Sequence, residues 1–273
     1  MEKFTVLMSV YGKDSPIYLI ESLESIKKQS KLPDQVIIIQ DGIVSEKLAN
    51  VINDFKKESD FTVDIIKFSE NHGLGYVLSK GVLASRNEII IRADADDISI
   101  DNRFELLMAY FESHPAVSIL GSYIVEFNKD RDDIVGKRQV PLTSTDISKF
   151  AVYRSPFNHP SVAFRRSSIL HIGNYRNIRG IEDYDLWIRA VHHNCLMANI
   201  PENLVLMRVG DGMYSRRGGK GYLKNYVLVK YQAYKLGVIS FTQFLIGTLI
   251  MSIHVNTPVF IKKLLYTKIL HRG

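Results

Sequence analysis

Acidic side chains gather at Asp94, Asp96 and Asp97. Carboxylates this close repel one another unless a cation or a set of hydrogen-bond donors holds them. Oxygen ligands without a neighbouring cysteine suit Mg²⁺ or Mn²⁺, which usually keep water ligands and bridge to the phosphates of a substrate. The structural alternative is a solvated turn in which Asp97 caps the next helix. Because the cluster directly follows an apolar segment that is typical of a strand, we expect it to bind a metal ion or a nucleotide.

A second acidic pair, Glu182 and Asp183, stands at the predicted start of a helix. A carboxylate can act as a general base towards a hydroxyl nucleophile, but the helix dipole also favours acids at this position for structural reasons. Trp187 lies four residues beyond Asp183, on the same helical face, and either packs in the core or offers its ring to a sugar. His159, in a proline-flanked loop, is by itself most typical of a structural histidine.

Short apolar segments alternate with amphipathic helices over the first hundred residues. We expect strands at 4–10, 35–39, 62–68 and 88–92. Strands that are apolar throughout are typical of parallel sheets covered on both faces, and right-handed crossovers then give an open α/β sheet. Ligands of such sheets bind at the carboxyl ends of the strands. These ends carry Tyr11, Asp41, Asn71 and the aspartate cluster.

The composition is that of a globular protein, with 273 residues, 46% hydrophobic and 23% charged. The single cysteine, Cys195, cannot form an internal disulfide or a cysteine metal cluster, which indicates a reducing compartment. The first residues carry no basic segment, and their apolar run is too short for a signal peptide. We therefore expect a cytoplasmic protein.

Charge is distributed unevenly along the chain. Residues 212–273 contain ten Lys or Arg and no Asp or Glu, whereas residues 1–211 contain 25 basic and 29 acidic side chains. A basic tail on a mildly acidic body indicates an anionic partner, either a nucleic acid or a membrane surface.

The apolar stretch at 241–253 is shorter than the roughly 20 residues that span a bilayer. Lys262, Lys263 and Lys268 follow it, so the stretch is typical of a helix lying on an anionic membrane surface. The alternative is a C-terminal helix pair that covers the preceding domain, and both can hold together.

Two other classes of protein are less consistent with the sequence. A nucleic-acid-binding protein could use the basic tail and stack bases on its tyrosines, but the acidic body carries no recognisable reader motif. A dinucleotide-dependent oxidoreductase would need G-x-G-x-x-G after the first strand, where SVYGKDSP stands instead.

Six segments stand in order over residues 4–210: VLMSVYG, QVIIIQDG, ENHGLG, RADADD, NHPSVAFRR and GIEDYDLWIR. Together they resemble family 2 glycosyltransferases of the GT-A fold, in particular bacterial O-antigen and exopolysaccharide enzymes of the amylovoran type. The resemblance implies an α/β GT-A fold with a Rossmann-like open mixed sheet and a helical, membrane-associating C-terminal extension. It divides the chain into a catalytic domain and that extension. The expected parts are a nucleotide-binding half at 1–100, an acceptor-binding half at 101–211 and the basic extension at 212–273.

The resemblance also implies roles for the residues on the nucleotide side. Tyr11 and Asp41 match the contacts to uracil. Asp94 is expected towards the ribose and Asp96 on the metal, Mn²⁺ or Mg²⁺. Asp97 supports them or meets the donor sugar, and the further residue expected near the donor is Arg103.

On the acceptor side, Asp183 matches the catalytic base and Glu182 is the second choice. His159 and Trp187 match positions around the acceptor. One position departs from the family pattern: many relatives carry a histidine that helps to bind the metal or the diphosphate where this chain has Gly210. Arg216 and Arg217, or Asp211, are expected to compensate.

The activity implied by the resemblance is an inverting transfer of a hexose from UDP-glucose or UDP-galactose. The acceptor would be a GlcNAc- or GalNAc-diphospholipid on undecaprenyl diphosphate, and the favoured linkage is β1,3. Such an enzyme would build O-antigen or exopolysaccharide repeat units as a peripheral protein on the cytoplasmic face of the bacterial inner membrane, with no nucleic-acid partner.

Overall fold

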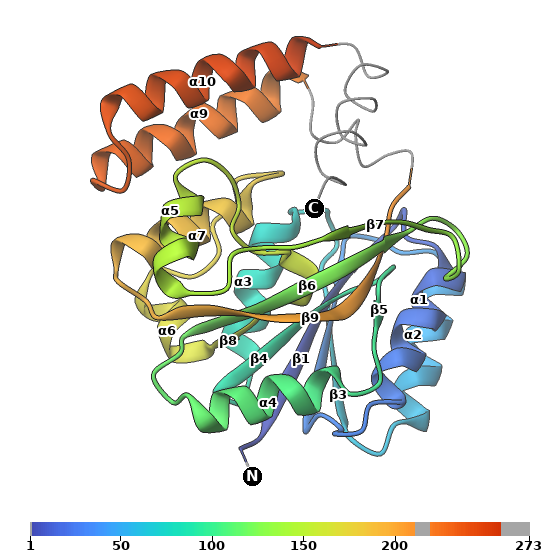
Figure 1. The fold of residues 1–273 in the computed structure, drawn as a ribbon. Helices are drawn as coiled ribbons and strands as arrows, with labels where there is room; N and C mark the ends of the chain where they lie inside the picture. The colour runs from blue at the N-terminus through green and yellow to red at the C-terminus, as the bar shows by residue number, and fades with distance from the viewer. Residues whose placement is uncertain (1, 211–218, 258–273) are drawn as a thin grey trace.

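A mixed sheet of nine strands forms the centre of the molecule, with helices on both of its faces (Figure 1). The computed structural model describes residues 2–210 and 219–257. The strand order is β3-β2-β1-β4-β8-β6-β9-β5, and β7 pairs with β6 outside this path. The α/β class and the open mixed sheet expected from the sequence are confirmed.

The first half of the chain builds the parallel part of the sheet. Its strands are β1 (Phe4–Tyr11), β2 (Gln35–Asp41), β3 (Thr62–Lys67) and β4 (Ile89–Asp94). They are connected by α1 (Pro16–Lys27), α2 (Glu46–Glu58) and α3 (Leu74–Ala84). All three pairings among these strands are parallel, as their continuous apolar sequences predict.

The second half adds antiparallel pairings. Its strands are β5 (Ile98–Ser99), β6 (Ile119–Phe127), β7 (Ile134–Arg138), β8 (Ala163–Arg165) and β9 (Met197–Arg208). Its helices are α4 (Arg103–Ser113), α5 (Ser144–Ala151), the 3₁₀ turn η1 (His159–Ser161), α6 (Arg166–His171) and α7 (Glu182–His192). Strand β8 runs antiparallel to β4 and β6, whereas β9 runs parallel to β6.

The sequence did not predict β9, although it is the longest strand. Pro201 and Glu202 are exposed in its middle, where the pairing with β6 is irregular, so the strand lacks both a continuous apolar run and a regular alternation.

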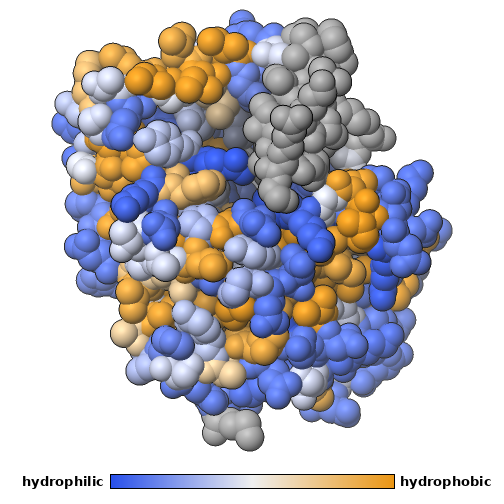
Figure 2. Space-filling model, viewed as in Figure 1, coloured by the Kyte–Doolittle hydropathy of each residue, from blue (hydrophilic) through white to orange (hydrophobic). Residues whose placement is uncertain are grey.

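Two further helices, α9 (Gly219–Lys235) and α10 (Phe241–Asn256), form a pair at one end of the molecule, beside α5 and α7 (Figure 1). Helix α9 packs against α7, as the alternative of a C-terminal helix pair predicts, whereas the domain bounds and the membrane association of the extension stay predictions. Apolar side chains of the outer helix give the orange area at the top of Figure 2. Within residues 2–210 and 219–257, no helix is long and apolar enough to cross a membrane.

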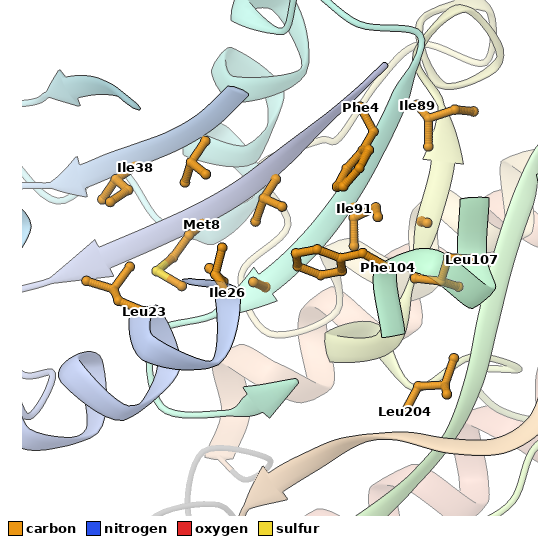
Figure 3. Close-up of a cluster of buried hydrophobic side chains, with 14 of the residues drawn as sticks. Phe4, Met8, Leu23, Ile26, Ile38, Ile89, Ile91, Phe104, Leu107 and Leu204 are labelled. Atoms are coloured by element: carbon orange, nitrogen blue, oxygen red, sulfur yellow. The ribbon is translucent and has the colours of Figure 1, made fainter. Parts of the chain in front are cut away.

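Strand β1 carries apolar side chains on both faces, so each face has its own core. Phe4 and Met8 pack towards α1 and α4 with Ile26 and Phe104 (Figure 3). Leu7 points to the opposite face, where α3 lies against the sheet. A Cβ atom at Gly81 of α3 would stand 2.2 Å from Leu7 Cδ1. The missing side chain therefore lets α3 approach β1 closely.

Lys230 of α9 connects the helix pair to the rest of the protein through buried hydrogen bonds. Its side chain is 1% exposed, and its ammonium donates to the Val152 carbonyl oxygen at 2.6 Å and to the Tyr184 hydroxyl at 2.8 Å. Tyr184 donates in turn to the Ala151 carbonyl oxygen at 2.7 Å. Burial lowers the pKa of Lys230 to about 8. The contact thus joins α9 to the first turn of α7, which carries Glu182 and Asp183.

We expect Gly81→Ala to lower the free energy of unfolding by about 1–3 kcal/mol, because the added methyl group overpacks the contact between α3 and β1. Gly221→Ala is the matched control: it is also a helical glycine, and an added Cβ there meets nothing within 4 Å. That variant should be neutral or gain up to about 1 kcal/mol from helix propensity. Urea unfolding of both variants measures the difference, and equal effects would contradict the packing argument.

Candidate active site

The parallel register brings the polar strand ends together at one edge of the sheet. Tyr11 at the end of β1 is paired with Asp41 at the end of β2, and Ser9 is paired with Asp94 at the end of β4. Tyr11 is 36% exposed, whereas Asp41 is buried. The strand-end group predicted from the sequence is therefore assembled by the backbone ladders themselves.

The three aspartates after β4 form a compact group of oxygen ligands. One carboxylate oxygen from each of Asp94, Asp96 and Asp97 lies within 4.8 Å of the others. Burial raises the pKa of Asp97 well above its usual value, and repulsion by Asp96 and Asp94 raises it further. Asp97 does not cap a helix, since α4 begins only at Arg103. A hard divalent cation fits this donor set, because it would relieve the repulsion and accept oxygen ligands.

Two buried arginines hold the aspartate cluster. Arg92 lies two residues before Asp94 on β4, and both nitrogens of its guanidinium fork pair with the Asp94 carboxylate, one of them at 2.7 Å. From β9, the backbone N–H of Arg208 donates to Asp97 Oδ1 at 2.8 Å, and its Nε donates to the Asp96 carbonyl oxygen at 3.2 Å. The Arg208 guanidinium also pairs with Glu21 and stacks on Tyr18.

Asp41 holds the loop that follows β3. Its Oδ2 accepts from Asn71 Nδ2 at 2.9 Å and from the Gly73 N–H at 3.0 Å, while Oδ1 accepts from the His72 N–H at 2.7 Å. Gly73 has φ of +93°, a conformation that favours glycine. Oδ1 keeps a lone pair beyond this contact, so the carboxylate can still accept from a ligand.

The second acidic pair, Glu182 and Asp183, begins α7 at a point where this helix packs closely against α3. A Cβ at Gly75 of α3 would stand 3.0 Å from Glu182 Cβ, so α3 and α7 touch at this point. Glu182 is 7% exposed, and its Oε2 has no hydrogen-bond partner within the described residues. Burial, followed by repulsion from Asp183, raises the pKa of Glu182 to about 7. Asp183 is less buried and accepts from Ser155 Oγ at 3.3 Å.

Tyr175 lies within electrostatic reach of both acidic groups. Burial raises the pKa of its hydroxyl, Arg92 lowers it, and the carboxylates of Asp183, Glu182 and Asp94 each raise it. The hydroxyl is 3.0 Å from His159 Nε2. Burial, together with the positive charge of Arg92, lowers the pKa of His159 well below its usual value. Carboxylates of both acidic groups therefore act electrostatically on the same buried hydroxyl.

Two predicted site residues lie inside the protein. Trp187 is fully buried against Phe157 and His159, so the core-packing alternative describes its indole. Arg103 is 1% exposed and donates to the carbonyl oxygens of Arg92 and Pro160 at 2.8 and 3.0 Å. Burial, reinforced by repulsion from Arg92, lowers its pKa to about 9.

Arg103 therefore contacts the backbone of Arg92, the residue that pairs with Asp94, and Trp187 packs against the ring of His159. Direct contacts of these two side chains with a donor or an acceptor stay predictions. Asp211, Arg216 and Arg217 lie outside the residues that the structure describes.

Sequence reasoning missed three residues of the site: Arg92, Arg208 and Tyr175. Arg92 left a signal, because a charged side chain interrupts the apolar strand EIIIR directly before the aspartates. Such a buried charge requires a partner nearby. Arg208 and Tyr175 left no comparable local signal, since their partners lie far away in the sequence.

We expect Glu182→Gln to stabilise the fold at high pH. Folding favours the neutral form of a carboxyl whose pKa rises from 4.5 to about 7, so the wild type loses stability as the pH rises through this interval, whereas glutamine does not. The melting temperature of the variant should exceed that of the wild type at pH 8 and approach it at pH 4.5. Glu202→Gln, on an exposed glutamate, is the control. A difference that does not change with pH would contradict the burial of an ionisable Glu182.

Comparisons with known proteins identify the family of the chain. The family model described as glycosyl transferase family 2 matches residues 5–173. The UDP-Gal:alpha-D-GlcNAc-diphosphoundecaprenol beta-1,3-galactosyltransferase of Escherichia coli is 37% identical over 273 residues, 99% of this chain and 97% of that protein. The amylovoran biosynthesis glycosyltransferase AmsE of Erwinia amylovora is 34% identical over 269 residues, 97% of this chain and 98% of that protein.

Solved structures share the fold at low sequence identity. Staphylococcus aureus TarS has a TM-score of 0.67 at 15% identity over 90% of this chain, which spans 43% of that chain. The mannosyltransferase PcManGT from Pyrobaculum calidifontis, in complex with GDP-Man and Mn²⁺, has a TM-score of 0.64 at 13% identity, covering 98% of this chain and 79% of that one. The chain has the GT-A fold of these transferases, and it belongs to glycosyl transferase family 2.

Proposed function

We propose that this protein transfers a hexose from a UDP-sugar to a hydroxyl of a saccharide linked through diphosphate to a lipid, with inversion at the anomeric carbon. The observation that carries the proposal is the compact group of oxygen ligands that Asp94, Asp96 and Asp97 form at the carboxyl end of β4 in a chain with the GT-A fold. The names of the Escherichia coli and Erwinia relatives support the reaction class, and UDP-GlcNAc bound to a TarS fragment with a TM-score of 0.66 supports a UDP-sugar donor.

Asp183 acts as the general base in this proposal. An acceptor hydroxyl attacks the anomeric carbon and gives its proton to the Asp183 carboxylate, the new C–O bond forms, and the bond to the diphosphate breaks with release of UDP. A positioned base contributes about 10²–10⁴-fold to such a step. Asp183 is more exposed than Glu182, and its contact with Ser155 orients the carboxylate. Glu182, with a pKa near 7, is the second candidate for the base.

Asp96 would hold Mn²⁺ or Mg²⁺ with help from Asp97, while Asp94, paired with Arg92, would face the ribose. When bound, the cation would neutralise the charge that develops on the leaving diphosphate. Arg92 and Arg208 keep the acidic side chains in place before any ligand arrives. The Mn²⁺ complex of the structural neighbour PcManGT supports this assignment.

The remaining donor and acceptor contacts are also proposals. Tyr11 and Asp41, adjacent in the parallel ladder, would bind the uracil, with the free lone pair of Asp41 Oδ1 accepting from the base. Arg216 and Arg217 would contact the diphosphate. His159 is proposed on the acceptor side: its ring is half-buried, Nε2 contacts the Tyr175 hydroxyl, and a lowered pKa favours the neutral form, which donates one hydrogen bond and accepts another.

The proposed donor is UDP-galactose, with UDP-glucose as the alternative, and the proposed acceptor is a GlcNAc- or GalNAc-diphosphoundecaprenol extended through a β1,3 linkage. The identity to the Escherichia coli galactosyltransferase supports this choice. The reaction would serve O-antigen or exopolysaccharide synthesis. Because the acceptor is a membrane lipid, we place the enzyme at the cytoplasmic face of the inner membrane, to which the basic C-terminal region would be attracted.

Asp183→Asn should lower kcat by at least about 100-fold, because the amide cannot take the proton of the acceptor hydroxyl. Binding of UDP should stay within twofold of the wild type, since the nucleotide is held on the other side of the site. A radiolabel-transfer assay with UDP-galactose and a short GlcNAc-diphosphate-lipid analogue measures kcat, and Glu202→Gln serves as the control. Near-normal turnover of the variant would rule out Asp183 as the base.

UDP should raise the melting temperature only when Mn²⁺ or Mg²⁺ is present, because the cation joins the diphosphate to the aspartates. At free UDP of 100 times Kd, the stabilisation amounts to about 2.7 kcal/mol. It should disappear with EDTA and in Asp96→Ala, but persist in Asp54→Ala, which removes an exposed aspartate of α2. Equal stabilisation by UDP with and without EDTA would contradict the proposed metal site.

A further inference from the structure

The outer helix of the C-terminal pair presents an apolar face that nothing covers within the described residues. Five large aliphatic side chains of α10 are each at least half exposed. They are Leu245 (50%), Ile246 (53%), Leu249 (63%), Ile250 (62%) and Ile253 (62%). Their spacing repeats at helical intervals, so they form one continuous stripe, which we call the α10 face. A contiguous exposed surface of this kind marks an interaction site.

The charge around the α10 face is complementary to an anionic surface. No acidic residue occurs from 212 to 273. On the adjoining helix α9, Lys220, Lys224 and Lys235 are exposed. Lysines beside an apolar surface that carries no carboxylates are attracted to the headgroups of an anionic bilayer.

Aromatic side chains gather where α9 turns into α10. Tyr234 packs against Phe241 and Phe244 with ring centroids 5.6 and 6.4 Å apart, and Tyr231 lies 6.1 Å from Phe244. Tyr231 and Phe241 are about half exposed, at 48% and 54%. Tyrosine, with its apolar ring and polar hydroxyl, concentrates at the boundary between acyl chains and headgroups, and Tyr231 and Tyr234 are of this type. This end of the pair is therefore suited to the level of the headgroups.

Geometry favours a helix that lies in the surface and does not cross it. With 16 residues, α10 is about 24 Å long, less than the roughly 30 Å of a hydrocarbon core. The helix pair lies at the end of the molecule towards which β1 runs, and α9 separates α10 from the sheet (Figure 1). A surface touching the α10 face would thus lie on the same side of the molecule as the carboxyl ends of the parallel strands.

We propose that the α10 face docks into the surface of an anionic phospholipid bilayer and holds the active site beside the membrane. Lys230, through Val152 and Tyr184, connects the helix pair to the first turn of α7. The benefit for catalysis rests on the proposed lipid-linked acceptor, whereas docking itself does not.

Vesicle flotation of the full chain tests docking without any substrate. The probes are vesicles of phosphatidylethanolamine and phosphatidylglycerol at 3:1, compared with pure phosphatidylcholine. The variant Leu249→Gln/Ile253→Gln should need at least tenfold more anionic lipid for half-maximal binding. The matched control Leu32→Gln/Leu83→Gln changes two exposed leucines elsewhere and should stay within twofold of the wild type. Thermal melting checks that both variants are folded.

Binding of the α10 variant that equals the wild type would overturn the proposal. So would a wild-type dimer in light scattering that becomes a monomer in this variant while vesicle binding persists, because the occupant of the face would then be a second copy of the chain. Wild-type binding that does not distinguish anionic from zwitterionic vesicles would contradict the role of the lysines.

Activity assays separate this proposal from the proposed function. The α10 variant should lose at least tenfold in transfer to a long-chain acceptor embedded in vesicles, yet keep wild-type rates with a short, water-soluble acceptor. Absence of transfer to either acceptor by the wild type, with vesicle binding still dependent on the α10 face, would support docking and overturn the proposed acceptor. Equal loss with both acceptors would overturn the docking role.

Discussion

Mutual repulsion of the carboxylates at the end of β4 is the constraint around which the rest of the site is arranged. Asp94, Asp96 and Asp97 are close enough to share a cation, and burial makes the charge on Asp97 costly. The fold restrains them with two buried arginines, Arg92 from the same strand and Arg208 from β9. A cation that enters such a cluster of carboxylates relieves their mutual repulsion, so its binding stabilises the site.

The same arrangement explains why the sheet is mixed. Four parallel strands align the polar strand ends, whereas Glu182 and Asp183 come from the second half of the chain. The antiparallel strand β8 pairs with β4, and η1, which directly precedes β8 in the chain, lies against β4. Strand β9 then carries Arg208 to a position where its backbone N–H meets Asp97, across more than one hundred residues of sequence. The second half of the chain thereby completes a site that the first half begins.

The C-terminal helices are connected to the site through the buried side chain of Lys230. Lys230 is buried without a carboxylate partner in the described part of the chain, and its ammonium depends on a carbonyl and a tyrosine hydroxyl for its hydrogen bonds. These hydrogen bonds form only when α9 packs in one position, because a displaced helix would leave the buried ammonium without them. The position of α10, and with it the exposed apolar face, is therefore tied to the helix that carries Asp183.

The amino-acid sequence by itself determined the parallel half of the fold, because β1, β2 and β4 are continuous apolar runs and their polar ends must share an edge. It also determined the aspartate cluster and the acidic start of α7, whose residue types stand together in the chain. Tertiary structure alone decided that Trp187 and Arg103 are buried, that Arg208 holds Asp97, and that β9 forms despite Pro201. These features depend on partners distant in sequence, and local propensity carries no information about the burial that such partners create.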